Sequence, residues 1–408
     1  MSRSIAAEKL RLETSLRNLK IYMSAQVMDL HGLWIHRVAL GWLTWTETES
    51  EFWVGMIAFA QFFPVVVLGP LFGVLADRMD RRRAAMALVA VLMVIAALMT
   101  ITSLAGVLDI WVILALSLAT GVAAGAYSPI RMSLVANLLA RAHLARGIAI
   151  NSLAFNASRF LGPMLAGLII VTWGPALAFA LNTLSYLVML LALANVRPLV
   201  RPRDSEARGD ILDELFSGLR YALDHPLIRS LLWLAMAVAV FGRGVMEMLP
   251  AFADGVFGRG APGLAWLTSA GGAGAICAGV WVLRGGQRVL QVTAPVSALL
   301  GGLLVSVFGV TPSFWLGLVL VAALGFCFSC FGISVQSLLQ VHVDEDYRGR
   351  VSSFWGVFGI GGSAFGAFLL GAVAPAVGLK AVTVASGILC VALCLATSLR
   401  VLKQKSPA

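Results

Sequence analysis

The stretch GVLADRMDRRR, residues 73–83, inserts two aspartates and four arginines between two long apolar segments. Charged side chains are costly in the hydrocarbon of a bilayer, so a burst of charge marks a place where a chain leaves the membrane. The flanking segments, about 53–76 and 84–106, each reach the roughly 20 residues that one helical crossing needs. The stretch therefore predicts a short loop between two membrane-spanning helices.

The composition extends this interpretation to the whole chain. Of 408 residues, 60% are hydrophobic and 12% are charged, whereas soluble domains carry about 25% charged residues. A soluble fold cannot hide that much apolar surface. We predict an all-α membrane protein with twelve spanning helices, over about 19–44, 53–76, 84–106, 109–129, 147–171, 175–196, 227–253, 262–283, 292–309, 314–338, 350–374 and 379–400.

The distribution of lysine and arginine predicts the orientation, because these residues accumulate in cytoplasmic loops. With the N-terminus inside, all cationic residues outside the spans fall on the cytoplasmic side except Arg259 and Lys380. We therefore expect cytoplasmic segments at both ends, residues 1–18 and 401–408, in a bacterial-type inner membrane. The net charge of +10 is on this interpretation a topology signal, and we expect no nucleic-acid partner.

The chain also contains a weak internal repeat. One common shift aligns Arg146 with Arg350 and Gly162 with Gly366. A repeat of six helices returns the chain to the same side, so we predict two six-helix bundles, 19–196 and 227–400, related by a pseudo-two-fold axis along the membrane normal. The connecting segment 197–226 begins rich in proline and charge and ends with leucines at helical spacing, which predicts a linker with an amphipathic interfacial helix.

Two motifs carry a family resemblance. Residues 73–82 resemble the loop signature G-x-L-A-D-R-x-G-R-R of the major facilitator superfamily, with Asp80 in place of the second glycine. Residues 158–167, SRFLGPMLAG, are similar to the antiporter motif of its exporters. The stretches 218–232 and 344–353 resemble the branch that contains the enterobactin exporter and macrolide efflux proteins. The resemblance covers essentially the whole chain and implies a transporter that works by rocking of two bundles.

For the loop signature, we expect a cytoplasmic gate. Asp77 stands at a helix end, where its charge can face the positive N-terminus of another helix, and we expect this to be the eleventh, near Arg350. The expected gate residues are Gly73, Asp77, Arg78, Arg81, Arg82 and Arg350. The alternative, that the arginines only set topology, explains the arginine run but not the adjacent aspartate.

Polar residues inside spans indicate the transport chemistry, because buried charges in membranes are usually functional. The candidates for proton coupling and the cavity are Asp29, His36, Arg37, Arg159, Arg243 and Glu247. Candidates for contact with the substrate are Gln26, Trp34, Phe62 and Phe241. Asp29 lies roughly 15 Å into its span, near the midplane, and is the expected proton carrier. It could instead be a structural partner of Arg37 or Arg159, and Arg243 could pair with Glu247 one helical turn away.

In the fifth span, Pro163 should weaken the helix, while Gly162 and Gly167 allow close helix packing. Close packing alone accounts for both glycines. The link between this motif and export is implied only by the resemblance.

Enzymatic interpretations find little support. The sequence contains neither H-E-x-x-H nor a phosphate-binding G-x-x-x-x-G-K-[ST] motif, and its five cysteines all fall within predicted spans. We expect no enzyme activity, metal or cofactor. The sequence favours a monomeric, proton-coupled exporter of small amphipathic molecules, siderophore-like or drug-like. The alternatives are a lysophospholipid transporter or flippase and a non-transporting receptor or scaffold.

Overall fold

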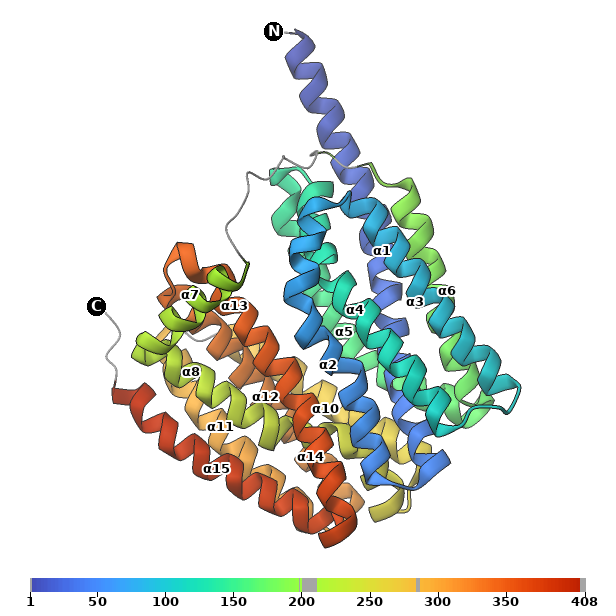
Figure 1. Cartoon of the computed structure of the whole chain (residues 1–408), viewed down its shortest axis with the longest axis vertical. Helices are drawn as coiled ribbons and strands as arrows, with labels where there is room; N and C mark the ends of the chain where they lie inside the picture. Colours follow the sequence, from blue (N-terminus) through green and yellow to red (C-terminus); the bar gives the residue numbers. More distant parts are fainter. Residues whose placement is uncertain (1, 198, 200–210, 284–286, 404–408) are drawn as a thin grey trace. The chain divides into compact units, whose positions relative to one another are not determined.

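The computed structural model describes residues 2–197, 199, 211–283 and 287–403. Within these ranges the ordered elements are helices, as the composition predicts (Figure 1). They form two compact units: residues up to 40 together with 64–199, and residues 41–63 together with 211 onward.

The first half of the chain forms six long helices. They are α1 (Ser2–Thr48), α2 (Glu51–Arg78), α3 (Arg81–Leu104), α4 (Ile110–Leu138), α5 (Arg141–Trp173) and α6 (Pro175–Asn195). The second half contains α7 (Ile211–Asp224), α8 (Pro226–Ala237), α9 (Leu249–Ala251), α10 (Gly260–Leu283), α11 (Gln287–Val310), α12 (Phe314–His342), α13 (Glu345–Gly356), α14 (Gly362–Val377) and α15 (Leu379–Lys403). The all-α fold class predicted from the sequence is confirmed.

Helix boundaries follow local capping chemistry. Asp80 Oδ1 accepts a hydrogen bond from the backbone N–H of Arg83 at 3.0 Å and so caps α3. Asp109 caps α4 in the same way, accepting from the N–H of Val112 at 2.8 Å. Such caps satisfy N–H groups that have no partner inside the helix. Asp80, the departure from the loop signature, thus has a definite role in starting the third span.

Several helices extend beyond the predicted span limits. The fourth span was expected to end near residue 129, but α4 continues to Leu138 and includes Arg131. The fifth was expected to begin near 147, but α5 begins at Arg141. Charge marks where a chain leaves the hydrocarbon, not where its helix stops, so helices that project from the membrane are longer than their apolar runs.

Eleven helices of the described residues are long and apolar enough to cross a membrane. The helix α1, with 47 residues, is long enough as well, but its polar residues keep it outside that group. With α1 as the first, the helices form the predicted all-α, twelve-helix membrane fold.

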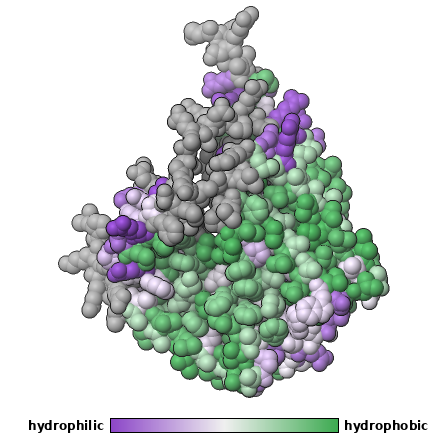
Figure 2. Space-filling view, viewed as in Figure 1, coloured by the Kyte–Doolittle hydropathy of each residue, from purple (hydrophilic) through white to green (hydrophobic). Residues whose placement is uncertain are grey.

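Outward-facing apolar stripes are consistent with a lipid-facing surface. On α11, the exposed hydrophobic residues recur at helical spacing: Val289, Val292, Val296, Leu300 and Leu303. A soluble monomer rarely exposes such continuous apolar stripes. Figure 2 shows hydrophobic residues over much of the visible surface of the described helices.

The first unit has its core between α1, α3, α4 and α6, where a cluster of buried side chains includes Tyr22, Tyr127 and Tyr186. Helix α3 packs against both α4 and α6. Three tyrosines are unusual in so apolar a core, because a buried hydroxyl is costly unless it is satisfied. They surround the candidate site described below.

The second unit is packed through small residues. A side-chain carbon added at Gly244 would lie 2.7 Å from the backbone of Gly366, so the seventh and eleventh spans meet backbone to backbone. Residues 41–63 pack into the same unit: Gly41 lies against Pro250, and Trp45 donates a hydrogen bond from Nε1 to Asp254 Oδ2 at 2.9 Å. The close approach is that of small-residue helix interfaces in membranes.

The seventh span is not a regular helix. Between α8 and α10 it passes through a π-helix (Val238–Gly242), a 3-10 helix (Arg243–Met248), the short α9 and a second π-helix (Phe252–Val256). Glycine disfavours the helix interior and proline lacks the N–H that continues it, so Gly242, Gly244 and Pro250 weaken the regular ladder. Such irregular turns are frequent at functional sites.

The linker helix forms where predicted. Helix α7 packs against α13, as Figure 1 shows. The rings of Tyr221 and Tyr347 stack with centroids 4.2 Å apart and planes within 2° of parallel. The backbone N–H of Asp344 donates to the Tyr221 hydroxyl at 3.2 Å. Burial raises the pKa of Tyr221, so the phenol stays protonated at neutral pH.

Candidate functional site

Asp29 lies in the core of the first unit, on the face of α1 that meets α4 and α6. Its side chain is 4% exposed, and among the described residues no hydrogen-bond donor reaches its Oδ1 atom. The cation that acts on it electrostatically is Arg131 of α4. The sequence suggested Arg37 or Arg159 as a structural partner of Asp29. In the structure, Arg131 interacts with Asp29 instead.

Three tyrosines share this environment. Tyr22 of α1, Tyr127 of α4 and Tyr186 of α6 are buried, and all three interact electrostatically with Asp29. The guanidinium carbon of Arg131 lies 6.0 Å from the centroid of the Tyr127 ring. The site thus combines one carboxyl group, which can take up a proton, with three phenols that can donate hydrogen bonds and one guanidinium that keeps its positive charge. We call these five residues the Asp29 cluster.

Two further polar residues of α1 are buried nearby along the helix. His36 is 4% exposed and meets Phe179 edge to face, with ring centroids 5.0 Å apart. Neither ring nitrogen of His36 has a hydrogen-bond partner among the described residues, and the same holds for both amide atoms of Gln26. Buried polar groups without hydrogen-bond partners lower the stability of the folded state.

Trp34 lies on another face of α1, and its ring is close to two of the arginines predicted to line the cavity. The guanidinium carbon of Arg37 lies 5.2 Å from the Trp34 ring centroid, and that of Arg159 lies 6.0 Å away. Cations near an indole face are stabilised by its quadrupole. A side-chain carbon added at Gly162 would lie 2.5 Å from the Cβ atom of Trp34. The fifth-span motif therefore packs directly on the tryptophan that holds both arginines.

The remaining residues of that motif lie in α5. Pro163 and Gly167 are buried, and α5 continues through Pro163 from Arg141 to Trp173. Ser158, at the start of the motif, contacts α1: its hydroxyl lies 2.8 Å from Nδ1 of His31, which also lies 2.8 Å from the Val27 carbonyl. Sequence reasoning had not placed this contact, because it depends on the rotation of α1 against α5.

In the second half, Arg243 and Glu247 fall in the 3-10 helix and are half-buried. Residues four apart in a 3-10 helix are rotated by about 120°, whereas in an α-helix they lie nearly above one another. The helix is therefore tighter here than the α-helix from which the pairing of Arg243 with Glu247 was predicted, and that pairing stays a prediction. Phe241, just before it, accepts a hydrogen bond at its carbonyl from the Ser386 hydroxyl at 2.7 Å. Phe62, on α2, is half-buried and belongs to the second unit.

The gate residues are only partly described. The surroundings of Gly73 and of the side chains of Asp77 and Arg78 lie outside the described part of the structure. The expected approach of Asp77 to the eleventh helix therefore stays a prediction. Arg81 is half-buried at the start of α3. Arg82 donates from Nε to the Leu193 carbonyl at 2.6 Å and from its second terminal nitrogen to the Ala194 carbonyl, so it holds the last turn of α6.

Arg350, at the other end of the expected gate, is engaged by the linker helix. It donates from a terminal nitrogen to the Ser217 hydroxyl at 3.0 Å, and its guanidinium carbon lies 5.4 Å from the Tyr347 ring centroid. Gly218 allows the approach, because a carbon added there would lie 2.8 Å from the Cβ atom of Arg350. The linker thus contacts the start of the eleventh span directly.

No cluster of three or more potential metal ligands occurs among the described residues. The arrangement consists of buried titratable groups on α1 and α4, cations over an indole, and an irregular seventh span.

Solved structures of transporters share the fold. The chain matches a bacterial homologue of the human lysosomal transporter Spinster, in an inward-facing and unoccupied conformation, with a TM-score of 0.70 and 16% identity over 97% of this chain and 99% of that one. It matches an auto-inhibited peptide transporter of the POT family with a TM-score of 0.73 and 12% identity, over 96% of this chain and 98% of that one. The fold is that of a major facilitator transporter.

The particular family follows from the sequence. The profile of the transmembrane secretion effector family, within the major facilitator superfamily, matches residues 16–407, and the chain belongs to this family. It is a multi-pass membrane protein of a transporter family.

Two relatives illustrate the similarity. The uncharacterized MFS-type transporter YfiS of Bacillus subtilis is 24% identical over 349 residues, which is 82% of this chain and 81% of YfiS. The enterobactin exporter EntS of Shigella flexneri is 29% identical over 241 residues, 57% of this chain and 55% of EntS. The match therefore spans little more than half of the exporter's length.

Proposed function

We propose that this protein is a proton-coupled exporter of small amphipathic molecules, siderophore-like or drug-like, that acts as a monomer by alternating access. It would lie in the cytoplasmic membrane with both termini in the cytoplasm. The observation that carries the coupling part is the Asp29 cluster: a carboxyl group sealed in the core of a membrane bundle beside one arginine and three phenols.

The physical argument is one of competing costs. An isolated carboxylate in a low-dielectric interior is strongly disfavoured, while a nearby guanidinium favours the ionised form. A group held between these two influences changes its protonation when the guanidinium moves or when water reaches it. Motion of α4 relative to α1 would therefore load or unload a proton at Asp29.

Export of an amphipathic cargo is supported by the likeness to the enterobactin exporter and by the fifth-span motif. The orientation is supported by the excess of lysine and arginine on alternate loops. It is tested by labelling with a membrane-impermeant thiol reagent: Lys380→Cys should react from outside in whole cells, and Lys403→Cys should not.

The decisive experiment measures protons and substrate separately. We expect Asp29→Asn to abolish substrate-induced proton release from the detergent-solubilised protein and to lower pH-gradient-driven transport in liposomes at least tenfold, because asparagine cannot carry a proton. The panel of candidate cargoes includes enterobactin, a cationic drug and lysophosphatidylcholine. Equilibrium binding of a neutral cargo should stay within about twofold of wild type.

Two variants serve as comparisons. Asp224→Asn alters an exposed carboxylate at the end of α7 and should leave proton release unchanged. Glu247→Gln tests the acidic residue of the seventh span. Normal proton release in Asp29→Asn would remove this residue from coupling, and loss of release only in Glu247→Gln would move the role to the second half. Transport of lysophosphatidylcholine alone would favour a lipid transporter.

A further inference from the structure

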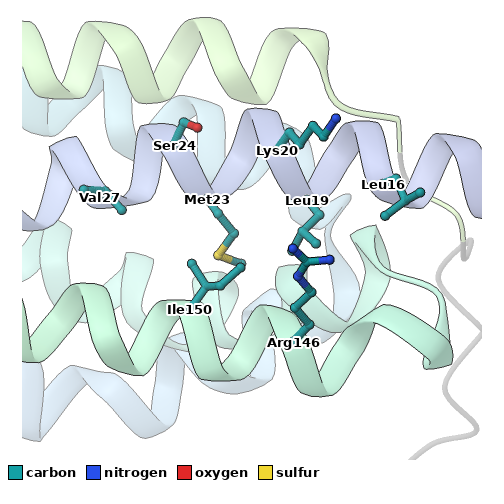
Figure 3. A pocket seen from close by; sticks show the side chains of 8 residues that line it. All are labelled: Leu16, Leu19, Lys20, Met23, Ser24, Val27, Arg146 and Ile150. Carbon is teal, nitrogen blue, oxygen red and sulfur yellow. The ribbon is translucent and has the colours of Figure 1, made fainter.

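A pocket of about 260 Å³ lies in the first unit, between the N-terminal part of α1 and the beginning of α5. It is distinct from the Asp29 cluster, which occupies the face of α1 toward α4 and α6. Its lining, seen in Figure 3, is made of Leu16, Leu19, Lys20, Met23, Ser24, Val27, Arg146 and Ile150. Neither the transport mechanism nor the family motifs account for it.

The walls of the pocket are fixed by hydrogen bonds from α1. Ser15 accepts from the backbone N–H of Ala140 at 2.9 Å, just before α5 begins. Asn18 donates to the carbonyls of Leu138 at 3.0 Å and Arg197 at 2.7 Å, and its Oδ1 atom accepts from the Arg197 N–H at 3.1 Å. These bonds join α1 to the ends of α4 and α6 and so fix the position of α1 next to the pocket.

The base of the pocket is apolar. Leu19 and Met23 are each 5% exposed, and Met23 points toward Ile150 (Figure 3). Helix α5 lies close to α1 here: a carbon added at Gly147 would lie 3.5 Å from Leu19 and 3.7 Å from Met23, which are van der Waals contacts. The pocket can therefore hold an alkyl or aromatic group against dry side chains.

Two cations border this apolar base. Arg146 reaches from α5 toward α1 and ends beside Leu19, while Lys20 projects from α1 on the side turned away from α5 (Figure 3). Both side chains are exposed, and none of the residues that line the pocket is acidic. Among the described residues, neither cation forms an ion pair. The site therefore has a surplus of positive charge.

The cations and the apolar residues lie at different depths. Lys20 and Arg146 stand where the apolar segments of their helices begin. Val27 lies about 10 Å further along α1 and Ile150 about 6 Å further along α5, at 1.5 Å of rise per residue. A molecule with a negative head and an apolar body matches this order, whereas a small inorganic anion would use only the cationic end.

We propose that this pocket is the cytoplasmic loading site for cargo and that it selects anionic amphiphiles, with the negative group held by Arg146 and the apolar part on Leu19, Met23 and Ile150, while Lys20, which points away from α5, adds only longer-range attraction. This inference rests on the proposed export function and narrows its substrate class. The volume is below the 300–1,000 Å³ typical of drug-sized sites, so the pocket receives the head and the first part of a larger cargo.

The test is equilibrium binding to the full-length protein in nanodiscs of zwitterionic phosphatidylcholine. The probe is dodecyl phosphate below its micelle concentration, compared with dodecyltrimethylammonium and inorganic phosphate. We expect dodecyl phosphate to bind and the other two to bind at least tenfold more weakly. Arg146→Gln should weaken binding about fivefold, as expected for a partly exposed charge contact, Lys20→Gln by less than twofold, and the double variant by no more than about tenfold.

The matched control is Arg17→Gln, which removes an exposed cation from α1 one turn before Lys20 and outside the pocket. It should leave binding within twofold, and Lys20→Arg should keep it. Equal loss in Arg17→Gln, or unchanged binding in the double variant, would overturn the site. Competition by phosphatidylglycerol in the nanodisc would assign the pocket to a bilayer lipid and overturn the cargo assignment. Because this binding needs no pH gradient, failure of proton coupling in Asp29→Asn leaves it unaffected, so the two proposals fail separately.

Discussion

At the scale of single residues, the charged loop that begins after α2 has several different structural roles. Asp80 caps α3, and Arg82 binds the last carbonyls of α6. Cations near a helix C-terminus satisfy free carbonyls and offset the helix dipole. Part of the arginine run is therefore explained by helix packing within the first unit, in addition to topology.

This role predicts a stability effect for Arg82→Gln. Loss of the hydrogen bonds to Leu193 and Ala194 should cost about 1 kcal/mol and lower the melting temperature in detergent by roughly 2 °C. The matched control is Arg83→Gln, because the recorded contact of Arg83 uses its backbone N–H and survives the substitution. An equal shift in both variants, measured by scanning fluorimetry, would mean that only net charge matters.

The residues of the Asp29 cluster show what sequence reasoning could and could not find. Asp29 is recognisable because a carboxyl group stands at mid-depth in an apolar run. Arg131 was missed because it follows the fourth apolar run and was counted as a loop residue. Tyr22, Tyr127 and Tyr186 lie on three different helices, so only the tertiary packing brings them to Asp29. Extending the fourth predicted helix past residue 129 would have placed Arg131 on the same helix as Tyr127.

At the scale of elements, apolar length predicted nearly every helix, because a bilayer demands about 20 residues per crossing. The same criterion could not predict the broken geometry of the seventh span. Glycine occurs 41 times in the chain, so Gly242 and Gly244 do not stand out. Their effect depends on the close approach of Gly366, which tertiary structure provides.

Helix α7 predicts a measurable docking interaction. Tyr221→Ala should release α7 from α13, because it removes both the ring stack on Tyr347 and the acceptor for the Asp344 N–H. We expect trypsin to cleave the Tyr221→Ala variant after Arg220 several times faster than the wild-type protein. The reason is that a protease cleaves a segment that is locally unfolded. Aromatic pairs of this kind contribute about 0.5–1.5 kcal/mol beyond burial.

The conservative change separates the two contributions. Tyr221→Phe keeps the stack and loses only the acceptor, so its cleavage rate should lie between those of wild type and Tyr221→Ala. Cleavage after Arg220 that is equally fast in wild type and Tyr221→Ala would show that α7 is not held by this contact.

At the scale of the whole molecule, the compact units do not coincide with the halves of the sequence. Residues 41–63, at the end of α1 and the start of α2, pack with the second half. The contacts include Phe59 with Phe368, whose ring centroids lie 5.3 Å apart, and Trp45 with Asp254. The internal repeat, which predicts two bundles, does not indicate that residues 41–63 pack with the second half.

The Trp45 hydrogen bond provides the test at this scale. Trp45→Phe keeps most of the ring and removes the N–H that binds Asp254, so the segment 41–63 should detach more often. We expect disulfide crosslinking between Phe59→Cys and Phe368→Cys, in a background without native cysteines, to slow about fivefold, as for loss of a hydrogen bond worth about 1 kcal/mol. Trp42→Phe is the matched control and should crosslink at the wild-type rate; an equal effect there would deny Trp45 a specific role.

The placement of residues 41–63 has a consequence for biosynthesis. Their packing partners around Pro250 and Phe368 emerge from the ribosome roughly 200 to 300 residues later, which at about 5–20 residues per second is a delay of some ten seconds to one minute. During that interval the glycine-lined surfaces of this early segment lack their partners. A chaperone or insertase that shields the nascent first half should therefore raise the yield of folded protein, and slowing translation after residue 63 should lower it.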